Sequence, residues 1–103
     1  MVPEDVEEVL RKVPGVDDVV VVGTPHPYLG AVVTAVVEGA AAGEGASRAA
    51  LEATARAELD PAQRPRRWYA AASLPRTPTG KPARGLVAAR LASGDDPGLR
   101  PLG

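Results

Sequence analysis

The sequence predicts one small α+β domain, in which a three-stranded sheet carries helices packed on it in the order α-β-β-α-β-α. Valine-rich runs at residues 19–22 and 32–37 are typical of buried strands. Stripes of apolar residues spaced three and four apart indicate helices before and after them. A length of 103 residues suits a single domain, and helices able to cover both faces of a sheet favour a layered sandwich.

The first element is predicted to be a helix over residues 3–13, which begins at Pro3 and ends at Pro14-Gly15. Its apolar side chains share one helical stripe: Val6, Val9, Leu10 and Val13. We expect its acidic side chains to form a solvated face: Glu4, Asp5, Glu7 and Glu8. Two of these acids, Glu7 and Glu8, stand four residues before Arg11 and Lys12, so ordinary helical ion pairs are expected.

Two strands follow, at residues 16–23 and 31–38. The first contains four consecutive valines, which indicates a strand buried on both faces. Residues 24–30 are predicted to be a loop, because Pro25 and Pro27 cannot donate to a strand ladder. The short connection favours an antiparallel pair.

A second helix is predicted from Ser47, as N-cap, to about residue 60, with Leu51, Ala55 and Leu59 facing inward. A third strand over residues 67–72 would place Trp68 and Tyr69 on opposite faces. After a proline-punctuated loop, Lys81 and Pro82 are expected to open a last helix with three inward residues: Leu86, Val87 and Leu91. Residues 93–103 are expected to form a flexible tail, outside a domain of residues 1–92.

The net charge of -1 hides a strong segregation of charge. Residues 1–60 carry eleven acidic and four basic side chains, whereas residues 61–94 carry seven basic side chains and no acidic one. The basic part either faces an anionic partner or docks against the acidic part of the same chain.

Several classes of function are excluded or disfavoured. The chain has no cysteine, which excludes disulfides, thiolate metal sites and a cysteine nucleophile. No apolar run reaches the roughly 20 residues that a membrane span needs, and the acidic start does not resemble a signal peptide, so we expect a cytoplasmic location. His26 lies between two prolines without nearby ligand partners, so we expect no chemical role and no metal site.

Residues 74–84 hold the best candidate for chemistry. The stretch is not a P-loop, because Pro75 occupies the first glycine position and Pro82 the Ser/Thr position. Prolines stiffen this loop, and Gly80 permits a sharp turn or a close approach to a ligand. Lys81 would then present a compact positive charge, suited to a phosphate or carboxylate oxygen, at a loop tip. A plain turn with a solvated lysine explains the spacing equally well.

This stretch resembles the catalytic-lysine motif of adenylate-forming enzymes, the superfamily of acyl-CoA synthetases, peptide-synthetase adenylation domains and luciferases. That motif reads approximately Leu-Pro-Arg/Lys-Thr-x-Ser/Thr-Gly-Lys-x-x-Arg/Lys. The matching residues are Leu74, Pro75, Arg76, Thr77, Thr79, Gly80, Lys81 and Arg84. Residues 3–16 and 22–30 resemble two further family segments in order and spacing, and the resemblance covers about residues 2–92.

The resemblance implies that this is the C-terminal lid domain of an acyl-CoA synthetase-like ligase, with Lys81 as the catalytic lysine for adenylation. It implies that Arg76, Thr77, Thr79 and Gly80 form the loop near substrate and nucleotide. The partners implied for the complete enzyme are a large N-terminal domain, in cis or in trans, and a carboxylic acid. ATP, Mg and a thiol acceptor, either CoA or carrier-protein pantetheine, complete the reaction. No ATP-binding element is recognisable here, so we expect the isolated chain to bind no cofactor and to form no adenylate.

Two alternatives remain open from the sequence. The chain could be a free-standing binding or regulatory module that keeps the fold without the activity. Trp68, Tyr69 and the neighbouring arginines could instead bind single-stranded nucleic acid by stacking. Adjacent aromatic residues on a strand point to opposite faces, which leaves only one stacking platform and disfavours the second alternative.

Overall fold

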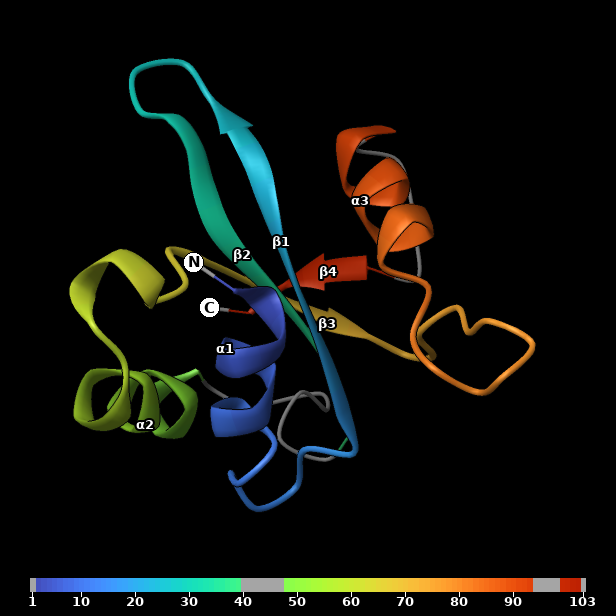
Figure 1. Cartoon of the computed structure of the whole chain (residues 1–103), viewed down its shortest axis with the longest axis horizontal. Helices are drawn as coiled ribbons and strands as arrows, with labels where there is room; N and C mark the ends of the chain where they lie inside the picture. The colour runs from blue at the N-terminus through green and yellow to red at the C-terminus, as the bar shows by residue number, and fades with distance from the viewer. Residues whose placement is uncertain (1, 40–47, 94–98, 103) are drawn as a thin grey trace.

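The computed structural model describes residues 2–39, 48–93 and 99–102, and shows an α+β domain with helices on both faces of an open sheet (Figure 1). The sheet has four strands in the order β1-β2-β3-β4. The strands are β1 (Asp18–His26), β2 (Gly30–Glu38), β3 (Arg67–Ala71) and β4 (Leu99–Pro101). The helices are α1 (Pro3–Leu10), α2 (Ala49–Glu58) and α3 (Arg84–Ser93), with a short 3-10 helix, η2, at Pro61–Gln63.

Strands β1 and β2 form the predicted antiparallel pair, with Val20 opposite Val36. Strand β3 pairs in parallel with β2, and α2 lies between them in the chain. The predicted loop over residues 24–30 is too long, because β1 continues through Pro25 to His26 and leaves only three residues for the turn. Pro25 is tolerated because β1 is an edge strand of the described sheet, where a missing N–H costs no ladder bond.

The valine run of β1 is buried on both faces, as predicted, because alternate side chains enter two separate cores. One core lies between the sheet and the helices α1 and α2; its larger members include Val6, Leu10, Val19, Val21, Leu51 and Trp68. The other lies under α3 and the segment before it: Val20, Val22, Val36, Ala71, Leu74 and Val87. Trp68 and Tyr69 therefore lie on opposite faces, as predicted, and Trp68 is too deeply buried to stack on a base.

The fourth strand corrects two expectations. The sheet has one strand more than the three predicted, and residues 99–102 are not part of a flexible tail. Strand β4 pairs antiparallel with β3, Leu102 is buried, and its backbone N–H donates to the carbonyl oxygen of Trp68 at 2.8 Å. A three-residue strand that contains proline leaves almost no periodic signal in a sequence, and only its neighbour in space reveals it.

The helices differ from prediction mainly at their ends. Helix α3 begins at Arg84, and Leu86 points outward with 55% of its surface exposed, whereas Val87 is fully buried and Leu91 is partly buried. The inward stripe of α2 is confirmed; the expected N-cap, Ser47, lies outside the described residues. Within the part of the chain that the structure describes, no helix is long and apolar enough to cross a bilayer.

Candidate functional site

The loop between β3 and α3 is closed on itself like a small hairpin. The N–H of Thr77 donates to the carbonyl oxygen of Lys81, and the N–H of Ala83 donates to that of Pro75, both at 2.7 Å. Arg76 and Pro82 form an isolated antiparallel bridge between these bonds. Figure 1 shows the loop, in orange, projecting from the body of the domain. We call residues 74–83 the lysine loop.

The turn of the lysine loop depends on Gly80. Its φ of 86° lies in the left-handed region, which residues with a Cβ adopt only at a cost. Its N–H donates to the carbonyl oxygen of Thr77 at 2.9 Å, and the hydroxyls of Thr77 and Thr79 are hydrogen-bonded to each other at 2.9 Å. The sequence therefore predicted the turn correctly, and the two threonines stabilise it from outside.

Lys81 directly follows this turn and is exposed. Among residues 2–39, 48–93 and 99–102, its ammonium group has neither a hydrogen-bond acceptor nor an ion-pair partner. The lysine loop contains no acidic residue, so the charge of Lys81 is not neutralised from within the loop. An anion that approaches the tip would meet an available cation on an ordered backbone.

Arg76, in contrast, is paired with carboxylates of the domain itself. Its guanidinium donates to Asp18 Oδ2 and to Glu38 Oε1, both at 2.9 Å, and weakly to the carbonyl oxygen of Gly80 at 3.4 Å. The other oxygen of Glu38 accepts the backbone N–H of Leu74 at 2.6 Å. Two carboxylates at one end of the β1–β2 pair therefore hold the start of the lysine loop.

The contacts of Asp18 change its acidity. Burial by itself would raise the pKa of Asp18, but hydrogen bonds from Arg76, from the N–H of Val19 and from Arg11 outweigh that effect. The pKa of Asp18 consequently lies below its ordinary value, and its carboxylate remains charged opposite Arg76 at neutral pH.

Arg84, just after the lysine loop, is held by α1. It donates to both oxygens of Glu7 at 2.7 and 2.8 Å, and to Glu4 at 3.3 Å. The prediction that Glu7 lies on a solvated face is wrong: it is only 3% exposed and also accepts the N–H of Val21 at 2.8 Å. The hydrogen bond to Glu7 raises the pKa of Arg84 above its already high ordinary value.

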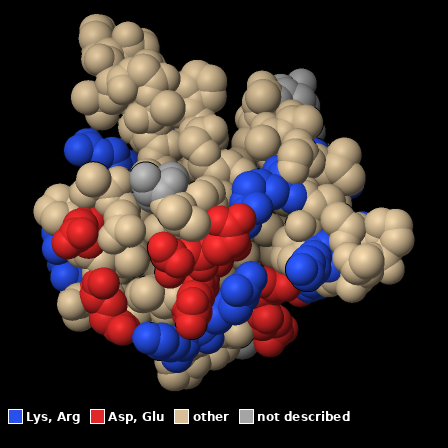
Figure 2. Space-filling model, in the orientation of Figure 1, with Lys and Arg blue, Asp and Glu red and all other residues tan. Residues whose placement is uncertain are grey.

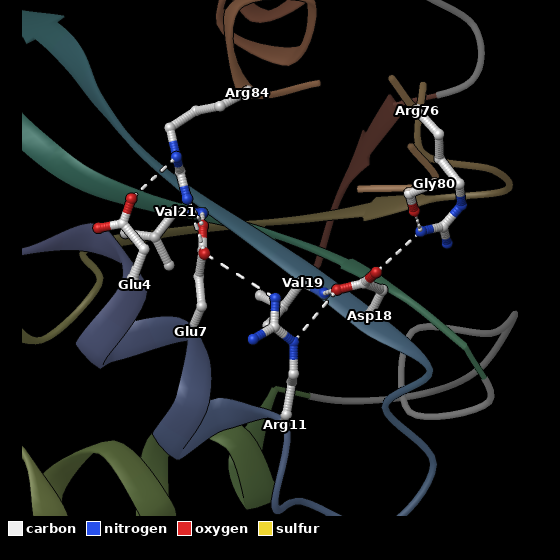
Figure 3. A network of polar contacts seen from close by, with 9 residues as sticks. All are labelled: Glu4, Glu7, Arg11, Asp18, Val19, Val21, Arg76, Gly80 and Arg84. Carbon is white, nitrogen blue, oxygen red and sulfur yellow. Dashed lines mark hydrogen bonds and ion pairs between the residues drawn. The ribbon is translucent and has the colours of Figure 1, made fainter. Parts of the chain in front are cut away.

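Arg11 connects the two arginine sites. Its guanidinium lies 3.9 Å from Glu7, which confirms the predicted helical pair, and 3.3 Å from Asp18. Lys12 does not pair as predicted within α1, but contacts Glu58 of α2 at 3.2 Å. Figure 3 shows the resulting chain of alternating charges, and Figure 2 shows acidic and basic side chains interleaved on this face of the molecule. Part of the basic segment thus docks against the acidic part of the same chain, which was one of the two explanations offered for the segregation of charge.

Sequence reasoning identified the lysine loop but missed the carboxylates that hold it. Asp18 and Glu38 stand at strand ends far away in the sequence, and nothing local relates them to Arg76. For Glu7, the available signal was its place at the edge of the apolar stripe, directly after Val6. His26 accepts the N–H groups of Tyr28 and Leu29 at 3.1 Å, and the described residues contain no group of three side chains that could hold a metal ion.

The fold is that of a small α+β domain, and its internally bonded loop presents a lysine that has no ion-pair partner among the described residues. Residues 5–81 match the family described as AMP-binding enzyme C-terminal domain, and the chain belongs to that family. The match ends at Lys81 itself.

Individual proteins agree with this assignment. The chain is 38% identical over 85 residues to the uncharacterized acyl-CoA ligase YhfT of Bacillus subtilis, which covers 82% of this chain and 17% of that protein. It is 40% identical over 80 residues to a medium/long-chain-fatty-acid–CoA/3-oxocholest-4-en-26-oate–CoA ligase of Mycobacterium tuberculosis, with 78% and 14% covered. The crystal structure of an acyl-CoA synthetase from Brucella canis superposes with a TM-score of 0.79 at 33% identity, over 91% of this chain and 18% of that one. The chain therefore spans less than a fifth of each of these proteins.

Proposed function

We propose that this chain acts as the lid domain of an acyl-CoA synthetase-like ligase, and that Lys81 is the lysine it brings to a large N-terminal domain for adenylate formation. The observation that carries the proposal is the state of Lys81, which is exposed on an ordered loop and has no ion-pair partner in the part of the chain that the structure describes. The relatives named above, both of them acyl-CoA ligases by name, support the class of reaction.

In such a reaction, a carboxylate attacks the α-phosphate of Mg-ATP, which forms an acyl-adenylate and releases pyrophosphate. Both reactants are anionic, and negative charge is redistributed around the phosphorus in the transition state. The ammonium of Lys81 would lie against these oxygens, where it reduces repulsion and stabilises the transition state. Covering the site with the domain would also exclude water, which strengthens the same interaction.

A thiol, from CoA or from a carrier-protein pantetheine, then displaces AMP from the adenylate. This second step needs no cation at the α-phosphate of ATP, so a lid that withdraws Lys81 would serve both steps. The structure suits that role, because Lys81 projects on the lysine loop rather than lying within the sheet. Arg76, Thr77, Thr79 and Gly80 would act by shaping this loop, since their polar groups bond to one another and to the domain.

The experiment replaces the C-terminal region of the Mycobacterium tuberculosis relative with this chain and measures ATP–pyrophosphate exchange with a fatty acid. We expect the fusion protein to catalyse ATP–pyrophosphate exchange faster than the truncated relative does. The isolated chain should catalyse no exchange. The positive control is the truncated relative fused again to its own C-terminal region. A folded fusion that remains at the level of the truncated protein, while the control recovers, would contradict the proposal and favour a non-catalytic binding module.

A further inference from the structure

We propose that Arg76 and Arg84 are positioning residues, which hold the lysine loop in one orientation on the sheet so that Lys81 moves only with the domain as a whole. The role in adenylation rests on the proposed function; the mechanical role does not. The observation behind the proposal is that the segment carrying Lys81 is held at both of its ends by carboxylates of the same ion-pair network.

The first attachment lies before the lysine and the second after it. Arg76 contacts Asp18 and Glu38, on the paired strands β1 and β2. Arg84 contacts Glu7, whose other bond goes to the backbone of Val21, again on β1. Both attachments therefore end on the same strand, and the backbone bonds within the loop connect one attachment to the other.

The two attachments are also coupled to each other. Arg11 lies between Glu7 and Asp18 and completes a continuous chain of alternating charges from Glu4 to Arg76 (Figure 3). Arg76 extends this chain to Glu38. Networks of this kind hold geometry better than isolated surface pairs, since each member limits the side-chain freedom of its neighbours.

The geometry argues against substrate binding by the two arginines themselves. The donors of Arg76 point to Asp18, Glu38 and the carbonyl oxygen of Gly80. The terminal nitrogens of Arg84 donate to Glu4 and Glu7, whereas its buried Nε has no hydrogen-bond partner among the described residues. An anionic ligand would compete with a carboxylate at either arginine, whereas Lys81 has no carboxylate partner among the described residues. Because electrostatic stabilisation of a transition state requires a donor already in place, the arginines would contribute through the position of Lys81.

The first test measures hydrogen exchange at the backbone N–H groups of Thr77 and Ala83 in this 103-residue chain. We expect Arg76→Ala to accelerate exchange at both sites by about fivefold or more, and Arg76→Lys by less, since a single ammonium cannot contact both carboxylates well. Amides in the centre of β2 should keep their protection, which reports that the domain remains folded. The matched control is Lys12→Ala, which removes the exposed pair with Glu58 and should leave the lysine loop unchanged.

The second test uses the fusion enzyme described above and measures the two half-reactions separately. We expect Arg76→Ala to slow adenylate formation by about tenfold and thioester formation from pre-formed adenylate by less than about twofold. A general loss of stability would slow both halves together. Arg76→Lys should recover part of the adenylation rate, and Lys12→Ala should retain all of it.

The outcomes separate the two proposals. Unchanged exchange at Thr77 and Ala83 in Arg76→Ala would overturn the positioning role, whatever the activity. Faster exchange in Arg76→Ala, combined with an adenylation rate that Lys81→Ala does not alter, would keep the positioning role and contradict the proposed function. Equal slowing of both half-reactions by Arg76→Ala would overturn the assignment of Arg76 to the position of Lys81.

Discussion

The guanidinium of Arg84 contacts both carboxylate oxygens of Glu7, which lies 77 residues earlier in the chain, at 2.7 and 2.8 Å. The same carboxylate accepts the backbone N–H of Val21. One buried acid thus connects the first helix, the first strand and the start of the last helix. Removing only one member of an ion pair in this position is costly, because the remaining charge stays buried away from water and no longer has a partner.

Replacing Glu7 should therefore destabilise the domain. We expect Glu7→Gln to lower the free energy of unfolding by about 2 kcal/mol, less than for a fully buried pair because the side chain of Arg84 is 38% exposed. Urea denaturation followed by circular dichroism provides the measurement. Glu8→Gln, at an exposed position of the same helix, should change stability by less than about 0.5 kcal/mol. Equal effects of the two substitutions would contradict the structural role of Glu7.

The lowered pKa of Asp18 predicts a specific dependence of stability on pH. Because the pKa of Asp18 is below its ordinary value of 3.8 in the folded state, the folded state binds a proton less readily than the unfolded chain does. The ionised carboxylate consequently stabilises the fold above that ordinary value, and the contribution is lost as the pH falls through the lower, folded-state pKa.

The measurement compares wild type with Asp18→Asn across a series of acidic buffers. We expect the difference in their free energies of unfolding to be largest near pH 5 and to shrink toward about pH 2, because only wild type loses this charge. Other acids titrate in both proteins and largely cancel in the difference. A difference that stays constant over this range would show that the charge of Asp18 is not responsible.

Lys81→Ala should separate the two steps of the proposed reaction. In the fusion enzyme we expect adenylate formation to slow by about 10²–10³-fold, the usual cost of one positioned electrostatic donor. Thioester formation from pre-formed adenylate should slow far less, and stability should change by less than about 0.5 kcal/mol, because Lys81 is exposed. Lys81→Arg should recover only part of the rate, since a planar guanidinium does not replace a compact ammonium. Equal slowing of both steps would refute the withdrawal of this lysine between them.

Leu102 provides a test of the fourth strand. Leu102→Ala should lower the free energy of unfolding by about 2 kcal/mol, because the side chain is buried in the core shared with Trp68. The matched control is Leu86→Ala, the same substitution at a side chain that is 55% exposed, with an expected change below about 0.5 kcal/mol. Similar values for the two leucines would mean that residues 99–102 do not pack as the structure shows.

The sequence alone was sufficient for the features that depend on neighbours in the chain. The apolar stripes of α1 and α2, the four valines of β1 and the turn at Gly80 each follow from residue type and local spacing. The lysine loop was recognisable for the same reason, since its residues are contiguous. A periodic or contiguous pattern can be recognised in the sequence itself, and these predictions agree with the structure.

The tertiary structure decided which distant residues meet. It placed Glu7 beneath Arg84, Asp18 and Glu38 beside Arg76, and Leu102 against Trp68. It also decided that Pro25 could remain in a strand, because only the order of strands determines which of them is at the edge. Ion pairs and edge positions depend on distances through space that local sequence does not encode. The sequence therefore identified the lysine that the domain presents, whereas the packing of β1, β2 and α1 determined how that lysine is held.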